Sequence, residues 1–440
     1  MKRTIVLGLL VTSTLFLFLN CKTPEKTITD AGNDLSHITA KEVERIERVL
    51  ASDEMRGRRA FTPDIEKAAD FIADEFKKIG LTSWNNSGSF RQEFVMVGLK
   101  QTSSSCTFDN ENLEEKDFVV VTCQPEIHID ERSGFEKIKI EPGKNLTQEA
   151  RNLMRSGKNY IVFVDTSHAR NFNRLNFLKR QLFKINNSVV FVLRNDEPKK
   201  YTIEARHEVT EQKLANVVGV IPGKSKKDEY VIFSAHYDHI GVTSRPVNGD
   251  SIYNGANDDA AGTTAVIMLA KYFKELKNNE RTLVFAAFTA EEMGGYGSQY
   301  FSQQFKPETV MAMFNIEMIG TDSKWGKNSA YITGYEKTDM GQILQKNLEG
   351  TGFTFHPDPY PTQNLFYRSD NATLARLGVP AHTISTAKMD NEPHYHKVTD
   401  HVETLDMENM AMIIKAIALS SRTIVAGKET PTRVKVEELR

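Results

Sequence analysis

The stretch Tyr230-Val-Ile-Phe-Ser-Ala-His-Tyr-Asp238 is a mainly apolar run that ends in a histidine and an aspartate. Such a run, without regular polar alternation, is typical of a strand buried on both faces. Further along the chain, a segment with helical periodicity and four more apolar runs follow: Gly262–Leu276, then Thr282–Phe288, Val310–Ile316, Ala330–Thr333 and Pro380–Ser385. This alternation predicts an α/β fold with a mostly parallel mixed sheet and helices on both faces.

Acidic residues and histidines gather where these strands end. They are His236 and Asp238 after the first strand, Asp258 and Asp259 before the helix, Glu291 and Glu292 after the second strand, Glu317 at the third, and His394 and His396 in a later loop. In parallel sheets the functional groups gather outside the carboxyl ends of the strands. Carboxylates and imidazoles brought together there would repel or stay undersatisfied without a cation. Two histidines and three carboxylates are the donor set of a site for two divalent metals.

These pieces, in this order, resemble the zinc peptidases of the M28 family, the bacterial aminopeptidases in particular. The resemblance runs from Leu50-Ala-Ser-Asp-Glu-Met-Arg-Gly57 through the following helix, and again from about residue 214 to residue 405. It implies a zinc-aminopeptidase-like α/β fold and the hydrolysis of peptide bonds. The expected substrates are therefore peptides.

The resemblance also implies two zinc ions per chain. His236 and Glu317 would hold one ion, Glu292 and His396 would hold the other, and Asp258 would bridge both. Glu317 stands where relatives usually carry an aspartate, so its side chain is one methylene longer.

Three more residues and one peptide bond take roles from the same resemblance. Glu291 would be the general base, because adjacent side chains at a strand end diverge and Glu291 cannot easily bind the ion that Glu292 binds. Asp238 would hydrogen-bond His236 and fix its orientation. Tyr395 would donate to the oxyanion, and the Asp258–Asp259 peptide bond would be cis.

Other polar residues near these pieces are expected outside the metal shell. His239 is expected at the surface or behind the ligands, and His394 at the rim. Arg368 forms either a structural ion pair or a contact with the substrate.

The N-terminus predicts export. Lys2 and Arg3 precede an apolar run from Ile5 to Leu19, which is too short for a membrane span of about 20 residues. The run ends at Cys21, so residues 1–21 are read as a lipoprotein-type signal peptide and Cys21 as the lipidated residue. An uncleaved anchor and a plain secretory signal are the alternatives. The expected location is the cell envelope, with the protein held on the membrane by a lipid anchor.

The remaining chain divides into a polar, flexible tether (22–40), the N-terminal part of the peptidase domain (41–90), an insert (91–210), the catalytic domain (211–425) and a polar C-terminal tail (426–440). The insert is β-rich and resembles a protease-associated domain, with Tyr160–Asp165 and Val189–Leu193 flanking a helix-like segment, Asn171–Lys184. Its Cys106 and Cys123 form either one disulfide or two free thiols.

The activity predicted is that of an aminopeptidase. A carboxypeptidase-like enzyme, with Arg368 binding the terminal carboxylate, is one alternative, and a glutaminyl-cyclase-like enzyme is another. A catalytically inactive receptor or adhesin module is a third alternative, from a different functional class. The net charge of −2 and the absence of any lysine- or arginine-rich block argue against nucleic acid as a partner. The oligomeric state is left open.

Overall fold

The computed structural model describes residues 35–439. Its central sheet has the strand order β17-β16-β18-β15-β11-β14-β10-β2-β3. The bounds are β17 Thr354–Pro357, β16 Ser329–Ile332, β18 Ala381–Ser385, β15 Val310–Ile316, β11 Lys226–His236, β14 Arg281–Phe288, β10 Tyr201–Ile221, β2 Arg91–Phe108 and β3 Glu111–Asn112. The four strands β18, β15, β11 and β14 run parallel to one another. The predicted fold class, an α/β fold with a mostly parallel mixed sheet, is therefore confirmed.

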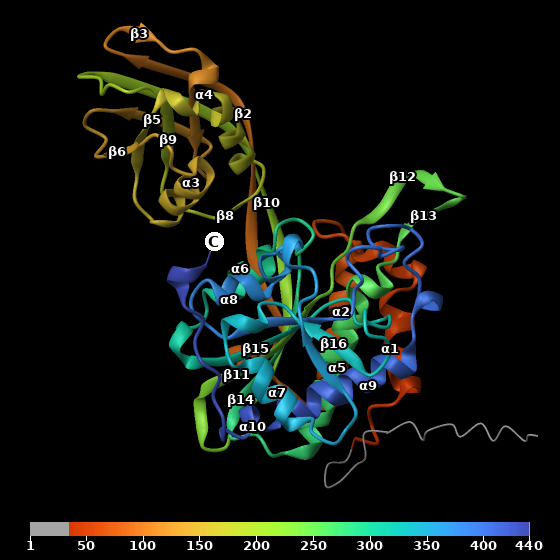
Figure 1. Cartoon of the computed structure of the whole chain (residues 1–440). Coiled ribbons are helices and arrows are strands. Elements are labelled where there is room, and N and C mark those ends of the chain that lie inside the picture. Colours follow the sequence, from red (N-terminus) through yellow and green to blue (C-terminus); the bar gives the residue numbers. More distant parts are fainter. Residues whose placement is uncertain (1–34, 440) are drawn as a thin grey trace, which may run out of the picture.

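Helices cover both faces of this sheet (Figure 1). One face packs against α1 (Ala40–Leu50), α2 (Asp64–Ile79), α5 (Ala261–Leu276), α7 (Met340–Asn347) and α9 (Met407–Ser420). The other face packs against α6 (Tyr296–Ser302), α8 (Asn371–Ala375) and Val434 near the C-terminus. Alternate residues of each strand point to opposite layers, so a strand covered on both sides must be apolar throughout.

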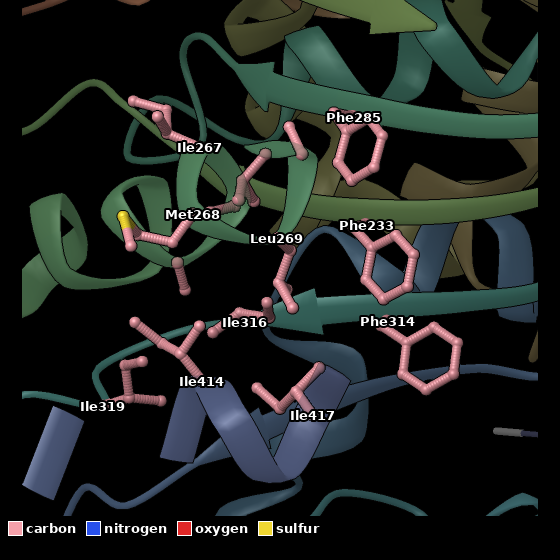
Figure 2. Close-up of a cluster of buried hydrophobic side chains, with 14 of the residues drawn as sticks. Phe233, Ile267, Met268, Leu269, Phe285, Phe314, Ile316, Ile319, Ile414 and Ile417 are labelled. Atoms are coloured by element: carbon pink, nitrogen blue, oxygen red, sulfur yellow. The ribbon is translucent and has the colours of Figure 1, made fainter. Parts of the chain in front are cut away.

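The larger core is built around three stacked phenylalanines on neighbouring strands (Figure 2). Phe233 is paired in register with Phe285 of β14 and Phe314 of β15. The ring of Phe233 lies 5.5 Å from that of Phe285 and 4.9 Å from that of Phe314, centroid to centroid. Each fully buried side chain of this size contributes roughly 1.5–3 kcal/mol, so this ladder holds the parallel strands in fixed register.

Strands β2 and β10 leave the central sheet and continue into a smaller module (Figure 1). They pair antiparallel from Arg91 to Phe108, and β5 (Glu126–Asp130) adds to β10. A second sheet has the order β4-β9-β7-β6, with bounds Phe118–Val121, Val189–Leu193, Tyr160–Val164 and Glu136–Ile140. The helix α3 (Leu146–Arg155) also belongs to this module.

The segment Asn171–Lys184 is not one helix, and here the expectation from the sequence is wrong. It contains the end of α4 (Ala169–Phe172), a 3-10 helix at Asn173–Lys179 and the short strand β8 (Leu182–Phe183). Its apolar residues are divided among several contacts, because Phe172 and Leu175 are buried in the module's core while β8 pairs with β2.

The two cysteines of the module are free thiols. Cys106 is buried in one hydrophobic cluster of the module, and Cys123 packs against another. Of the alternatives left open by the sequence, the structure therefore shows two unpaired cysteines.

Both ends of the described chain are packed against the main domain. Leu35 and Ile38 are fully buried in the larger core. Near the other end, Arg433 donates hydrogen bonds to the carbonyl oxygens of Val310 and Pro307. No helix within residues 35–439 has the length and apolar character needed to cross a membrane. The predicted signal peptide, Cys21 and most of the predicted tether lie outside the described residues.

Candidate metal centre

Three parallel strands end at one edge of the sheet, and several polar side chains of the site lie at or just after these ends. His236 is the last residue of β11 and pairs with Phe288, the last residue of β14. Glu291 and Glu292 follow β14 after two residues, and Glu317 follows β15 directly. Ala290 and Met318, which flank these carboxylates, have positive φ angles of 56° and 53°. Such backbone conformations are unfavourable for non-glycine residues and concentrate at functional sites.

The first group that could hold a metal ion consists of His236, Asp258 and Glu317. One ligand atom from each residue lies within 4.8 Å of the others. Nε2 of His236 is 3.2 Å from Oδ1 of Asp258. Oε2 of Glu317 is buried and accepts no hydrogen bond in the described structure. This is the group predicted for one of the two ions.

The second group shares Asp258 and adds Glu292 with two histidines. Nε2 of His396 lies 3.2 Å from Oδ2 of Asp258 and 3.2 Å from Oε2 of Glu292. Nδ1 of His239 lies 2.8 Å from Oε1 of Glu292 and 4.0 Å from Oδ2 of Asp258. One ligand atom from each of His239, Asp258 and Glu292 also lies within 4.8 Å of the others.

His239 is therefore a site residue that the sequence reasoning missed. From the sequence we expected it at the surface or behind the ligands, but its side chain is fully buried and faces Glu292. The signal was its position, three residues after His236 in the segment that leaves β11. His394, by contrast, lies outside both groups, and its Nδ1 is 2.9 Å from Oγ1 of Thr399.

Asp258 occupies the centre of the site, between the two groups. Burial raises its pKa, but hydrogen bonds from His236 and His396 outweigh burial and keep the pKa well below its ordinary value. Its backbone is held by Asp400, whose carboxylate accepts the N–H groups of Asn257 and Asp258 at 2.9 and 3.1 Å. The Asp258–Asp259 peptide bond is cis, as expected.

Asp259 holds the strand ends together instead of facing the metal groups. Its carboxylate accepts the backbone N–H groups of His236 (3.3 Å), Gly262 (3.0 Å) and Met318 (3.0 Å). A Cβ atom at Gly262 would lie 2.5 Å from the carboxylate oxygens, so this position requires glycine. One carboxylate thereby ties together β11, α5 and the end of β15.

Glu291 belongs to neither metal group but lies beside them. Its backbone N–H donates to Oδ1 of Asp238 at 3.0 Å. Burial raises the pKa of Glu291 well above its ordinary value; His236 lowers it, while Asp370 and Glu317 raise it further. A buried carboxyl group with a raised pKa has the affinity for protons that a general base needs.

Asp238 acts on both neighbours, through different atoms. Nδ1 of His236 lies 3.1 Å from the backbone carbonyl oxygen of Asp238 and 3.8 Å from its carboxylate. The carbonyl therefore orients the imidazole, while the carboxylate holds the backbone of Glu291. The sequence-based hypothesis assigned the orientation of His236 to Asp238 without distinguishing these atoms.

Tyr395 and Arg368 line a cavity of about 40 Å³ next to Glu317. The ring of Tyr395 stacks on that of His396, 3.9 Å between centroids, and burial raises the pKa of its hydroxyl. Arg368 is exposed and makes one long contact, 3.5 Å from its Nη1 to Oε1 of Gln363. Within residues 35–439, Arg368 forms no ion pair, so of its two predicted roles the structural one is absent.

A second residue that we did not predict, Arg58, supports the loops of the site. It is fully buried, and its guanidinium donates to the carbonyl oxygens of Leu50 (2.6 Å), Tyr237 (2.8 Å), Asn254 (2.6 Å) and Gly255 (2.9 Å). These bonds join α1 to the segments just after His236 and just before Asp258. Arg58 directly follows Gly57 within the region of resemblance, and this position was the available signal.

The chain matches a known family over this region. Residues 216–420 match the model of peptidase family M28. The chain is 30% identical over 204 residues to a probable leucine aminopeptidase of Trichophyton verrucosum, covering 44% of this chain and 53% of that protein. It is 35% identical over 109 residues to a probable zinc metalloprotease of Pyrenophora teres f. teres, covering 24% and 23%. The chain thus spans about half the length of the first of these relatives, and less of the second.

Solved structures with the same fold cover most of the chain. An aminopeptidase from Aneurinibacillus sp. strain AM-1 has a TM-score of 0.51 at 18% identity, covering 92% of this chain and 98% of that one. A zinc aminopeptidase from Bacillus subtilis has a TM-score of 0.52 at 16% identity, covering 92% and 97%. Residues 216–420 are therefore similar to peptidase family M28, and the chain has the fold of the zinc aminopeptidases.

Proposed function

We propose that this protein is a di-zinc exopeptidase that removes residues from the free N-terminus of peptides. The observation that carries the proposal is the pair of metal-ligand groups that share Asp258, with Glu291 beside them and in neither. The relatives named above as a leucine aminopeptidase and a zinc metalloprotease support the same reaction class.

The donors fit two zinc ions. Oε2 of Glu317 and Nε2 of His239 are buried without a hydrogen-bond partner in the described structure, and Nδ1 of His239 faces Oε1 of Glu292 at 2.8 Å. Buried polar atoms of this kind are costly unless they are paired or bind a metal. We assign His236, Asp258 and Glu317 to one ion, and Asp258, Glu292 and His396 to the other, with His239 as an additional donor to the second. Two bound zinc ions would polarise the scissile carbonyl and lower the pKa of water between them.

Glu291 moves the proton in this proposal. Its carboxylate takes a proton from the attacking water and returns it to the leaving amine. The hydrogen bond from its N–H to Asp238 keeps the side chain beside the metal groups. Tyr395, next to His396, donates a hydrogen bond from its hydroxyl group to the oxyanion that forms on the substrate.

The negative charge of the site supports cleavage at the N-terminus of the substrate, where the α-amine is positively charged. The site is crowded with carboxylates, and Glu291, Glu292 and Glu317 can hold a protonated α-amine. The side chain of the first residue would enter the cavity of about 40 Å³, which is lined by Met318, Leu365 and Met389 among others.

One alternative has a specific observation in its favour. Arg368 is exposed, forms no ion pair in residues 35–439 and lines the cavity beside Glu317, so it could receive the terminal carboxylate in a carboxypeptidase-like reaction. A glutaminyl-cyclase-like reaction needs one working zinc ion, and the full donor set argues against it. The same donor set and Glu291 argue against an inactive receptor or adhesin module.

We also propose that the protein works outside the cytoplasm, held on the membrane by a lipid on Cys21. The charged residues Lys2 and Arg3, the short apolar run and the cysteine at its end support this location.

Metal analysis combined with a peptide panel tests the proposal. Purified protein titrated with zinc should bind about two ions per chain and hydrolyse peptides with a free N-terminus. Acetylating the N-terminus of the substrate should abolish turnover, whereas amidating its C-terminus should not. Binding of fewer than one ion at saturating zinc would refute the metal site. Activity on acetylated peptides that is lost on C-terminal amidation would replace the aminopeptidase by a carboxypeptidase.

A further inference from the structure

A large cavity separates the smaller module from the main domain and opens onto the metal centre. It has a volume of about 1080 Å³. Its walls come from α3 and the segment around β8 on one side, and from α6, α8 and the loop of Glu291 and Glu292 on the other. The two cavities meet at Arg368 and Ser369, so a peptide whose first residue lies beside Glu317 would continue into the larger cavity.

Three arginines without acidic partners line this cavity. Arg151 and Arg155 belong to α3, and Arg376 follows α8. In the described part of the chain, none of the three forms an ion pair. Burial lowers the pKa of Arg155, and the neighbouring charges of Arg151 and Arg376 lower it further, which places the three cations close together.

Several other arginines of the protein do have acidic partners. Arg48 and Arg206, for example, each lie 2.9 Å or less from a carboxylate oxygen. Three like charges without a counterion destabilise one another, and an anion that enters between them removes that repulsion.

The cluster is connected to the catalytic loop by hydrogen bonds and packing. Nη2 of Arg155 donates to Oε1 of Gln299 at 2.6 Å, and Nε2 of Gln299 donates to the carbonyl oxygen of Gly294 at 2.7 Å. Gly294 in turn donates its N–H to the carbonyl oxygen of Glu291 at 2.9 Å. The smaller module is also fixed by Phe183, whose ring packs against those of Tyr296 and Tyr300.

We propose that Arg151, Arg155 and Arg376 bind a carboxylate on the part of the peptide substrate that lies beyond the cleaved bond. This inference rests on the proposed function and names its substrate class: peptides with an acidic side chain or a nearby C-terminal carboxylate. The planar guanidinium group matches a carboxylate with two parallel hydrogen bonds. The smaller module thus contributes two of the three binding residues.

Matched peptides test the site and separate the two sources of carboxylate. The first pair carries Glu or Gln after the cleaved bond and is amidated at the C-terminus. The second pair carries neutral side chains and ends in either a free carboxylate or an amide. We expect the wild-type zinc-loaded protein to favour the carboxylate member of at least one pair by roughly tenfold in kcat/KM, mainly through KM.

The triple variant Arg151→Gln/Arg155→Gln/Arg376→Gln should remove this preference. Turnover of the neutral, amidated peptides, which offer no carboxylate to the three arginines, should fall less than turnover of their carboxylate partners. The control Arg170→Gln/Arg174→Gln/Arg245→Gln removes the same charge from exposed positions outside the cavity and should keep the preference. Equal rates within both peptide pairs in the wild type, or a preference that survives in the triple variant, would overturn the proposal.

Binding measurements keep this test independent of hydrolysis. Fluorescence anisotropy with fluorescently labelled forms of these peptides and zinc-loaded Glu291→Gln protein should show the same preference for the carboxylate peptides. This preference should be lost when the three arginines are also replaced. If the wild type cleaves no peptide yet these binding preferences appear, the proposed function fails and the arginine site stands. If all peptides bind alike, the arginine site fails.

Discussion

Nδ1 of His239 lies 2.8 Å from Oε1 of Glu292, inside the candidate metal centre. The other oxygen of the same carboxylate lies 3.2 Å from Nε2 of His396, so two imidazoles flank Glu292. The side chain of His396 is 38% exposed and that of His239 is 0% exposed. One histidine therefore approaches from solvent and the other from the protein interior, and Nε2 of His239 has no hydrogen-bond partner in the described structure.

From this arrangement we predict that His239→Ala weakens the binding of one of the two proposed zinc ions by about 10–100-fold, the range found when groups that support a metal site are removed. The ion held by His236 and Glu317 should stay bound. Competition with a chromogenic chelator measures both affinities. His394→Ala is the matched control and should bind two ions like the wild type. Native affinity for both ions in His239→Ala would show that His239 is not a donor.

Substitutions of the neighbouring residues Glu291 and Glu292 are predicted to have different effects on zinc binding and turnover. Glu291→Gln keeps the shape of the side chain but cannot accept a proton, so zinc should stay bound while kcat falls by about 10²–10⁴-fold. Glu292→Gln should lose affinity for one ion, with activity that partly returns at high zinc. Metal content and kinetics of both variants check this. Metal loss in Glu291→Gln with metal retained in Glu292→Gln would exchange the two roles.

The elements of the parallel sheet could be predicted from the sequence because each strand is buried on both faces. Val310–Ile316 agrees with its prediction to the residue. Strands β2 and β10 were not predicted because their outer halves, on a sheet with one solvent-exposed face, contain no continuous apolar run of the kind that marks the parallel strands. The first eight residues of β10 alternate between buried and exposed, and β2 passes through the polar stretch Thr102–Ser105. These local patterns do not reveal that the two strands run through both modules.

The site could be anticipated in part, for a comparable reason. His236, Asp258 and Glu317 stand at strand ends, and the sheet topology alone brings them to one edge. His239 lies in an irregular segment, where the direction of a side chain depends on tertiary packing. Arg155 and Arg376 lie 221 positions apart in the numbering and meet only because the smaller module packs against α6 and α8.

Arg58 should be required for both stability and metal binding. Its guanidinium donates hydrogen bonds to four carbonyl oxygens. The single ammonium group of a lysine can neither reach all four nor reproduce the planar arrangement of donors. We expect Arg58→Lys to lower the free energy of unfolding by about 3–5 kcal/mol, the range seen when a buried charged network is broken. It should also weaken zinc binding, because Asn254 and Gly255 precede Asp258. Urea unfolding of the metal-free protein and chelator competition measure the two effects. Native stability in this variant would contradict the structural role of Arg58.

Location is predicted from the N-terminal segment. Cys21→Ser should move the protein from the membrane fraction to the soluble exported fraction, because lipid chains supply the proposed anchoring. Fractionation of cells that express either form measures this, and Cys123→Ser is a control that leaves the signal intact. Unchanged membrane association of the Cys21→Ser protein would favour an uncleaved helix instead of a lipid.

The last prediction concerns pH and a histidine outside the metal centre. His382 is buried in β18, with Nδ1 2.8 Å from the carbonyl oxygen of Thr333 and Nε2 2.8 Å from Oγ1 of Thr338. A neutral imidazole satisfies both partners by donating from Nδ1 and accepting at Nε2. Burial lowers the pKa of His382 from its ordinary value of 6.5 to about 4, although the Thr333 carbonyl raises it slightly.

Between these two pKa values the unfolded chain binds a proton at this histidine and the folded chain does not. The contribution of neutral His382 to the free energy of unfolding is therefore fully present above pH 6.5. It is lost as the pH falls toward 4, with a slope that approaches roughly 1.4 kcal/mol per pH unit. In His382→Gln, whose amide can donate and accept without titrating, this slope should disappear. Urea unfolding of metal-free wild type and variant at pH 7 and pH 5 should show their difference in stability changing by about 2 kcal/mol in favour of the variant at the lower pH. The metal-free samples exclude loss of zinc as the cause. An unchanged difference between the two pH values would mean that the folded protein takes up a proton at His382 as readily as the unfolded chain does.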